Sequence, residues 1–308
     1  MTVCIASCVN VRDFTDLSEK SISTHPLKYV KIKNLKFAYI EKGTGPLVLL
    51  LHGFPENAST FDAVIDELAL AGYRAVAPFT RGYYPTDIPS NNDYCISTLA
   101  KDAIQLIEVF GEKEAVIIGH DWGGSAAYAA ASIAPGTVRK IVTISNPHPI
   151  KVKNNIYKSI VRAKHILLFQ FRGISEWIVR RNKFSYLDTL YDRWSPTWKI
   201  PKVQMDKYKA SLAMDGRLEA ALGYYRGLFG RKCDDGLSRN LVQKTQVPTQ
   251  LFSGGADGAL AHTLYDNLHD SFDGQFKHIY LEDSGHFIHN QNHEIFMREL
   301  LYFLDSKD

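Results

Sequence analysis

The strongest constraint on the fold of this chain is an apolar run that ends in glycines placed around an aspartate. Residues 117–124 read Ile-Ile-Gly-His-Asp-Trp-Gly-Gly, and a run of small residues follows at 125–131. The apolar part predicts a buried strand, and the small residues predict a tightly packed helix. A strand that turns sharply into a helix needs glycines beside the turning residue, whose backbone is strained. We therefore expect Asp121 at this turn.

Strand and helix patterns alternate on both sides of the turn. A hairpin is expected over residues 29–39, where apolar residues alternate, and it precedes the continuous apolar run at 47–51. Further expected strands lie at 73–78, 139–144, 249–255 and 276–281, and expected helices at 60–71, 99–110, 261–268 and 294–304. This alternation predicts an α/β fold with a mostly parallel central sheet and helices on both faces.

The alternation stops between residues 148 and 244. This segment is rich in aromatic and basic residues, has helical periodicity and contains no convincing strand. A chain of 308 residues suits one core domain with an inserted second unit. We predict an N-terminal arm at 1–27, a core domain at 28–147 and 245–308, and a helical cap at 148–244.

Composition limits the classes of partner and location. The net charge of +3 is small and the basic residues do not form one stripe, so we expect neither nucleic acid nor a membrane surface as a partner. No stretch approaches the ~18 to 20 apolar residues of a membrane-spanning helix, which favours a soluble, cytoplasmic protein. The four cysteines lack metal-ligand spacing and are too few for a disulfide scaffold. We expect free thiols, and no metal or organic cofactor.

Three chemically active side chains follow three of the expected strands. Asp121, Asp257 and His286 come in the order nucleophile, acid, histidine. Because the carboxyl ends of parallel strands share one edge, we expect these groups to meet there. A carboxylate nucleophile suits displacement at an alkyl carbon and forms an ester. His286, oriented by Asp257, would activate the water that hydrolyses the ester, and the backbone N–H groups of Phe54 and Trp122 would stabilise the oxyanion.

Each of these assignments has an alternative. Asp121 could be a helix N-cap, a role for which aspartate is well suited. Asp283, three residues before His286, competes with Asp257 as the acid, although a turn role fits it better. His52 and His120 flank the expected site, and we expect both to be structural.

The chain resembles a known family over residues 28–304. The motifs that carry the resemblance are His52-Gly53-Phe54-Pro55, the run from Gly119 to Gly124, and Asp283-Ser284-Gly285-His286. Together they resemble the epoxide hydrolase and haloalkane dehalogenase branch of the α/β-hydrolase fold. Haloalkane dehalogenases often carry Asn where Phe54 stands, and fluoroacetate dehalogenases carry Arg where Trp122 stands. The resemblance therefore favours epoxide hydrolases.

This resemblance also implies two hydrogen-bond donors in the cap that open the epoxide. The family typically uses two tyrosines, and Tyr225 matches the second, with its neighbour Tyr224 as a rival. Where the first tyrosine is expected, before Phe169-Gln170, this chain has His165, as in the subgroup that uses a His/Tyr pair. Tyr157 is the alternative donor. The cap tryptophans Trp177, Trp194 and Trp198 are expected in the hydrophobic core.

The sequence therefore predicts an epoxide hydrolase that converts a small or medium apolar epoxide and water to a vicinal diol, without a cofactor. A haloalkane or haloacid dehalogenase with the same nucleophile is the first alternative. The second is a ligand-binding protein on this scaffold, which would not need a working histidine. A homodimer is compatible with the sequence.

Overall fold

Eight strands form one sheet in a computed structural model that describes residues 22–155, 164–229, 233 and 243–306. Their order across the sheet is β1-β2-β4-β3-β5-β6-β7-β8. The strands are β1 (Lys28–Ile32), β2 (Leu35–Lys42), β3 (Leu47–Leu51), β4 (Arg74–Pro78), β5 (Ala115–His120), β6 (Val138–Ile144), β7 (Thr249–Gly254) and β8 (Phe276–Leu281). The pairs β1·β2 and β2·β4 are antiparallel and the others are parallel. The predicted α/β fold with a mostly parallel sheet is confirmed.

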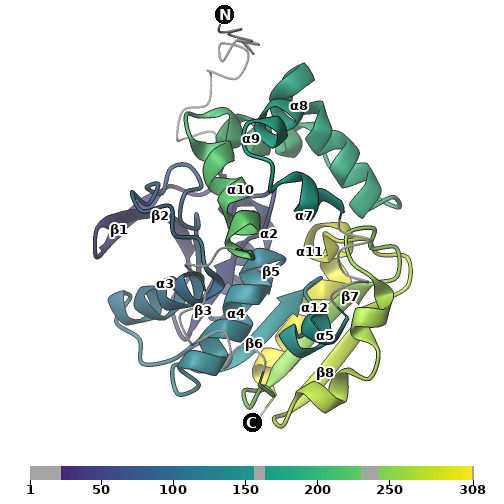
Figure 1. The fold of residues 1–308 in the computed structure, drawn as a ribbon. Helices are drawn as coiled ribbons and strands as arrows, with labels where there is room; N and C mark the ends of the chain where they lie inside the picture. Colours follow the sequence, from purple (N-terminus) through teal and green to yellow (C-terminus); the bar gives the residue numbers. More distant parts are fainter. Residues whose placement is uncertain (1–21, 156–163, 230–232, 234–242, 307–308) are drawn as a thin grey trace, which may run out of the picture.

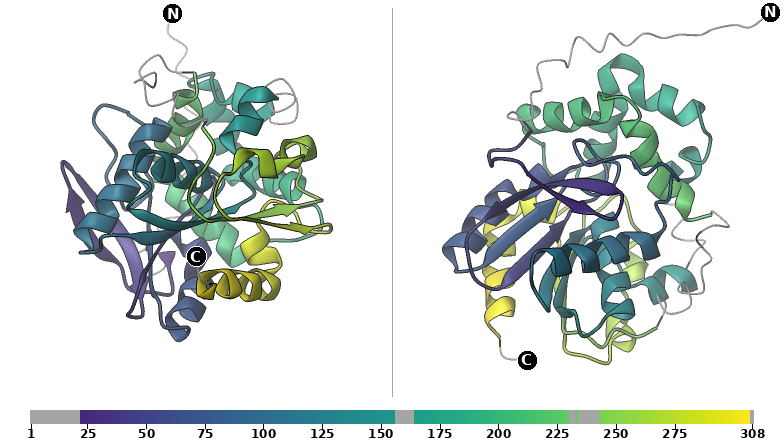
Figure 2. Two further views of the ribbon diagram at one scale, coloured as in Figure 1. Left: turned by 90° about the horizontal axis from the view of Figure 1, so that it is seen from below. Right: turned by 90° about the vertical axis from the view of Figure 1, so that its left-hand side faces the viewer.

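Helices cover both faces of the sheet, as predicted. Helices α3 (Ile96–Val109) and α4 (Trp122–Ile133) lie on one face, and α2 (Asp62–Leu70) and α12 (His293–Asp305) lie on the other (Figure 2). Every residue of β3, β5 and β7 is buried, because side chains on both faces of these strands meet helices. The sheet thus separates two hydrophobic clusters.

In the described residues, every named element between β6 and β7 is a helix. These helices are α5 (Pro149–Asn154), α7 (Lys164–Leu168), α8 (Ile174–Trp194), α9 (Lys202–Ala213) and α10 (Arg217–Gly227). Helices α7 to α10 gather over one end of the sheet, whereas α5 lies lower, beside the core (Figure 1). Helix α5 contacts the 3₁₀ turns η5 (His262–Tyr265) and η6 (Leu268–Ser271) of the core. The boundaries of arm, core and cap stay predictions.

The chain after β7 differs from the expected helix over residues 261–268. The two separate turns η5 and η6 occupy this region instead. Asp266, which follows η5, is extended, and Asn267 has φ 49° in the left-handed region. A left-handed residue ends a right-handed helix, and Asn adopts this conformation more readily than most residues. The hydrophobic period alone could not reveal this break.

The expectation that all cysteines are free thiols is wrong for one pair. Cys95, just before α3, forms a disulfide with Cys233, which follows α10, and their Cα atoms are 5.2 Å apart. The pair is 138 residues apart in sequence, so no local spacing pointed to it. Disulfides are rare in cytosolic proteins, so this bond does not support the predicted cytoplasmic location. Within the described ranges, no helix has the length and apolar character needed to cross a membrane.

Candidate active site

Asp121 occupies a strained turn between β5 and α4, as the sequence predicted. Its backbone has φ 49° and ψ −114°, a conformation that non-glycine residues seldom adopt. A side chain at Gly123 would overlap the backbone of Leu51, and one at Gly119 would overlap Gly123. Asn146, after β6, donates from Nδ2 to the Asp121 carbonyl at 2.8 Å. Packing and hydrogen bonding therefore hold the strained residue in place.

His286 lies between the two predicted acids. Its Nδ1 is 2.8 Å from Asp257 Oδ2, and its Nε2 is 3.7 Å from Asp121 Oδ2. The side chains of His286 and Asp257 are each 1% exposed, and that of Asp121 is 20% exposed. The rival acid Asp283 is exposed on the surface. The structure thus brings Asp121, Asp257 and His286 together, and their catalytic roles stay a prediction.

The carboxylate of Asp121 faces the cavity rather than capping its helix. Its side chain makes no capping hydrogen bond to α4, and Oδ1 instead accepts from the Phe54 N–H at 3.0 Å. Trp122 is the first residue of α4, so its N–H is one of the amides that a helix leaves without an internal partner. The two predicted oxyanion donors therefore flank the same carboxylate.

Electrostatics favour an ionised Asp121 beside a protonated His286. Burial raises the pKa of Asp121. Four opposing effects outweigh burial and lower this pKa: contact with His286, the charge of His286, the charge of His120 and the hydrogen bond from Phe54. Burial lowers the pKa of His286, but the charge of Asp257, contact with both carboxylates and the charge of Asp121 outweigh burial and raise it to about 10. An ester on Asp121 would remove one of these charges, so the pKa of His286 should then fall.

Asp121→Asn, which imitates the loss of charge on esterification, is expected to lower the pKa of His286 clearly below about 10. A carboxylate stabilises the imidazolium and an amide does not, which sets the sign of this change. NMR titration of the His286 ring measures it. Asp283→Asn, an exposed change in the same loop, should leave the pKa unchanged. Equal pKa values in Asp121→Asn and the unmodified protein would contradict the assigned electrostatics.

A cavity of about 460 Å³ opens beside Asp121 and His286. Its wall is largely apolar, with side chains from the core and from the cap. Five lining residues carry a buried polar atom that has no hydrogen-bond partner of normal geometry: Trp122 Nε1, His165 Nδ1, Trp194 Nε1, the Tyr225 hydroxyl and His286 Nε2. Buried polar groups are normally paired, so five exceptions around one cavity mark it as a ligand site.

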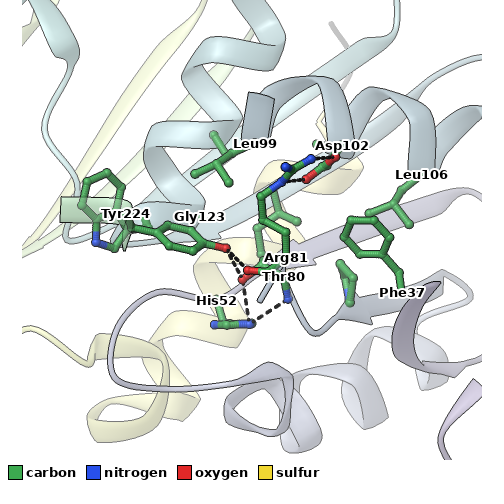
Figure 3. Close-up of a pocket in the computed structure, with 14 residues that line it drawn as sticks. Phe37, His52, Thr80, Arg81, Leu99, Asp102, Leu106, Gly123 and Tyr224 are labelled. Atoms are coloured by element: carbon green, nitrogen blue, oxygen red, sulfur yellow. Dashed lines mark hydrogen bonds and ion pairs between the residues drawn. The ribbon is translucent and has the colours of Figure 1, made fainter. Parts of the chain in front are cut away.

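The structure distinguishes the two adjacent tyrosines of α10. Tyr224 is not among the residues that line this cavity, and its hydroxyl donates to the Arg81 carbonyl at 2.8 Å (Figure 3). Thr80, which also contacts Tyr224, lies 3.1 Å from His52 Nε2, so His52 belongs to this structural network (Figure 3). Tyr225 instead lines the cavity. Burial, with the charge of Asp121 adding to it, raises the pKa of Tyr225 well above 10, so its hydroxyl stays protonated.

His165 lines the cavity from α7, and its ring meets the Tyr225 ring edge-on at 5.5 Å. Burial lowers the pKa of His165 to about 3, so the neutral ring offers one N–H donor. The alternative donor Tyr157 lies outside the described residues. Trp194 is buried as expected, but it also lines the cavity. For Trp177 the core prediction is wrong, because this residue is 46% exposed, and Trp198 is only partly buried.

Behind His286 lies a buried polar cluster that we did not predict. In the part of the chain that the structure describes, Glu56, His120 and His289 form the one group with metal-like spacing, their ligand atoms lying within 4.8 Å of one another. Glu56 Oε2 is 2.8 Å from His120 Nδ1, and His120 Nε2 is 3.1 Å from the His286 carbonyl. Burial raises the pKa of Glu56, but the neighbouring histidines have the larger combined effect and lower this pKa to about 2. Glu56 Oε2 thus contacts both histidines, His120 at 2.8 Å and His289 at 3.7 Å.

Sequence reasoning also missed residues that support the site from a distance in sequence. Asn146 follows β6 without forming part of a recognisable motif, and Ser195 ends α8 inside the cap. Glu56 did stand in a visible signal, directly after His52-Gly53-Phe54-Pro55. An acidic residue directly after the motif that supplies the expected oxyanion donor Phe54 was the one sequence signal that could have indicated this polar cluster.

Comparisons with known proteins agree with this fold. Residues 46–292 match the family model described as alpha/beta hydrolase fold. An AB hydrolase superfamily protein, YfhM, from Bacillus subtilis is 32% identical over 85% of this chain and 91% of its own length. Epoxide hydrolase 3 of Xenopus tropicalis is 28% identical over 84% of this chain and 72% of its own. The crystal structure of a Bacillus megaterium epoxide hydrolase in complex with an inhibitor superposes with a TM-score of 0.80 at 24% identity, covering 91% of this chain and all of that one, which shows a common fold.

Proposed function

The chain belongs to the α/β-hydrolase fold family, and from this premise we propose that it is an epoxide hydrolase that opens an apolar epoxide through an ester on Asp121. One observation carries the proposal. The Asp121 carboxylate shares a largely apolar cavity with two cap groups that make no hydrogen bond of normal geometry, the Tyr225 hydroxyl and a ring nitrogen of His165. Relatives named epoxide hydrolases in Xenopus tropicalis and Homo sapiens add support.

In the first half-reaction, an Asp121 carboxylate oxygen attacks one epoxide carbon and the carbon–oxygen bond of the ring breaks. Oδ2 is the oxygen in position to attack, because Oδ1 is held by the Phe54 N–H. The released alkoxide needs a proton, and the protonated Tyr225 hydroxyl supplies it while His165 donates a hydrogen bond. The product of this step is a hydroxyalkyl ester of Asp121.

In the second half-reaction, water attacks the carboxyl carbon of Asp121. His286 takes the proton from that water, and Asp257, at 2.8 Å, stabilises the resulting imidazolium. The oxyanion develops on the oxygen that faces the N–H groups of Phe54 and Trp122. Collapse of this intermediate breaks the ester bond and returns the proton from His286 to the leaving diol oxygen. Asp121 leaves this step as a carboxylic acid, and its proton passes to the Tyr225 phenolate left by the first half-reaction. Asp121 is thereby regenerated as a carboxylate and Tyr225 as a phenol.

A haloalkane substrate is the second candidate, and a specific observation favours it. The indole N–H groups of Trp122 and Trp194 line the same cavity, and neither makes a hydrogen bond of normal geometry, although Trp122 contacts Tyr225. Two such donors would suit a leaving halide, which is an anion and needs no proton. The epoxide is preferred because a hydroxyl and an imidazole, which can serve an alkoxide, also line the wall.

The proposed function is tested by giving the protein a phenyl-substituted terminal epoxide and, separately, the primary bromide of the same carbon skeleton. We expect diol formation from the epoxide, and no turnover by Asp121→Ala. Chromatography measures the diol, and ion analysis measures released bromide. Bromide release without diol would identify a dehalogenase, whereas no product from either compound would favour a ligand-binding role.

A further inference from the structure

The end of helix α8 crosses directly over the two loops that carry Asp257 and His286. We call residues Trp194 and Ser195 the strap. The Trp194 carbonyl accepts from the Gly258 N–H at 3.2 Å and from the His286 N–H at 3.0 Å. The Ser195 hydroxyl oxygen also accepts from the His286 N–H, at 2.9 Å. One stretch of the inserted segment is thus bonded to both catalytic loops at once.

The two loops have glycines where the strap passes. A side chain at Gly258 would overlap the carbonyl of Arg193, and a side chain at Gly285 would overlap Ser195. Ser195 has no exposed surface. Such close approach is possible only without a Cβ, so the loops and the strap fit one another over several residues.

Ring packing adds to these backbone contacts. The Trp194 indole lies against the His286 ring, with centroids 5.0 Å apart. One turn earlier in α8, Tyr191 stacks on Phe287 at 3.9 Å with an interplanar angle of 6°. His286 is therefore held on its backbone by the strap and on its ring by Trp194, while its Nδ1 meets Asp257.

We propose that the strap is a positioning element for His286, so that the inserted helical segment controls the second half-reaction as well as the ring opening. Ser195 is the residue that tests this role. Its hydroxyl never contacts the epoxide in this scheme and acts only through the backbone N–H groups of His286 and Phe287, at 2.9 Å and 3.4 Å. The kinetic part of the inference rests on the proposed function, because it assigns His286 to ester hydrolysis.

Ser195→Ala removes one acceptor of the His286 N–H while the Trp194 carbonyl remains, so the fold should persist. Displacement of a catalytic group by part of an ångström lowers rates by about 10- to 100-fold. We expect ester hydrolysis to slow by that factor and the rate of Asp121 alkylation to stay unchanged, so that the ester accumulates during turnover. Rapid quenching followed by intact mass measures both rates. Unchanged alkylation also shows that the variant is folded.

Ser211→Ala is the matched control. Ser211 is a buried serine of α9 that also accepts one hydrogen bond from the core, from Asn57 Nδ2 at 3.0 Å. It lies away from His286 in the hydrogen-bond network, so neither half-reaction should change selectively. If Ser195→Ala leaves hydrolysis unchanged, or slows both half-reactions equally, the strap does not position His286.

A second measurement does not depend on any epoxide. The titratable groups that interact with His286 are Asp257, Asp121, His120, His165 and His289, and Asp257 makes the shortest contact. If the strap sets the distance between His286 and Asp257, Ser195→Ala should lower the pKa of His286 in an NMR titration and Ser211→Ala should not. An unchanged pKa would overturn the inference. Absence of diol and ester in the unmodified protein would instead refute the proposed function, which keeps the two failures distinct.

Discussion

His286→Gln protein mixed with a phenyl-substituted epoxide is expected to accumulate an adduct of the mass of the intact epoxide on Asp121. Glutamine keeps much of the size of histidine but cannot accept the proton of the attacking water. General base catalysis contributes about 10²- to 10⁴-fold, so hydrolysis of the ester should slow by that factor. Alkylation needs only the carboxylate and the cap donors and should continue. Intact mass spectrometry followed by peptide mapping measures and locates the adduct.

The matched control is the double variant Asp121→Asn with His286→Gln, which lacks the nucleophile and should remain unmodified. An adduct on another residue would contradict the assignment of Asp121. Steady diol formation by His286→Gln at the rate of the unmodified protein would contradict the role of His286. No adduct with either the epoxide or the matching bromide would favour a binding protein, despite the contact between His286 and Asp257.

Asp121 and His286, which these experiments test, could be predicted from the sequence to lie close together, because the sheet is mostly parallel. Each of the three groups follows a strand, and β5, β7 and β8 run in the same direction. This shared strand direction predicts that the loops after the three strands lie at one edge of the sheet, even though 165 positions separate Asp121 from His286. The distances of 2.8 Å and 3.7 Å around His286 required the structure.

Features that depend on long-range contacts without a periodic pattern were not predictable in this way. The disulfide between Cys95 and Cys233 joins two residues that are 138 positions apart, and no strand or helix pattern in the sequence brings them together. Trp194 is a large apolar residue of the kind expected in a hydrophobic core. Its helix has no strong amphipathic pattern that would show which side of the helix faces the cavity. The hydrogen bond from His286 to Ser195 forms only because α8 crosses the catalytic loops. Local sequence does not encode such crossings.

Tyr225→Phe is expected to lower the rate of Asp121 alkylation by an epoxide about 100-fold or more, because the alkoxide then leaves without its proton donor. Hydrolysis of an ester already formed should be unaffected, since Tyr225 does not act on the water. Rapid mixing with epoxide and intact mass measures alkylation. Tyr224→Phe is the matched change on the same helix. Loss of the hydroxyl that contacts the Arg81 carbonyl and Thr80 Oγ1 should cost about 1 to 2 kcal/mol of stability and far less activity.

A comparison of the epoxide with the bromide distinguishes two roles of Tyr225, that of a proton donor and that of a residue that only shapes the cavity. Bromide is a stable anion, so alkylation by the matching bromide needs no proton and Tyr225→Phe should slow it by less than about 10-fold, the effect of one hydrogen bond. A selective loss with the epoxide would therefore assign proton donation to the hydroxyl. Equal losses with both compounds would mean that Tyr225 only shapes the cavity. In that case the remaining candidate donors among the described cap residues of the cavity wall would be the His165 ring and the Trp194 indole N–H. A selective loss with the epoxide in His165→Phe would then assign the role to His165, whose neutral ring offers one N–H.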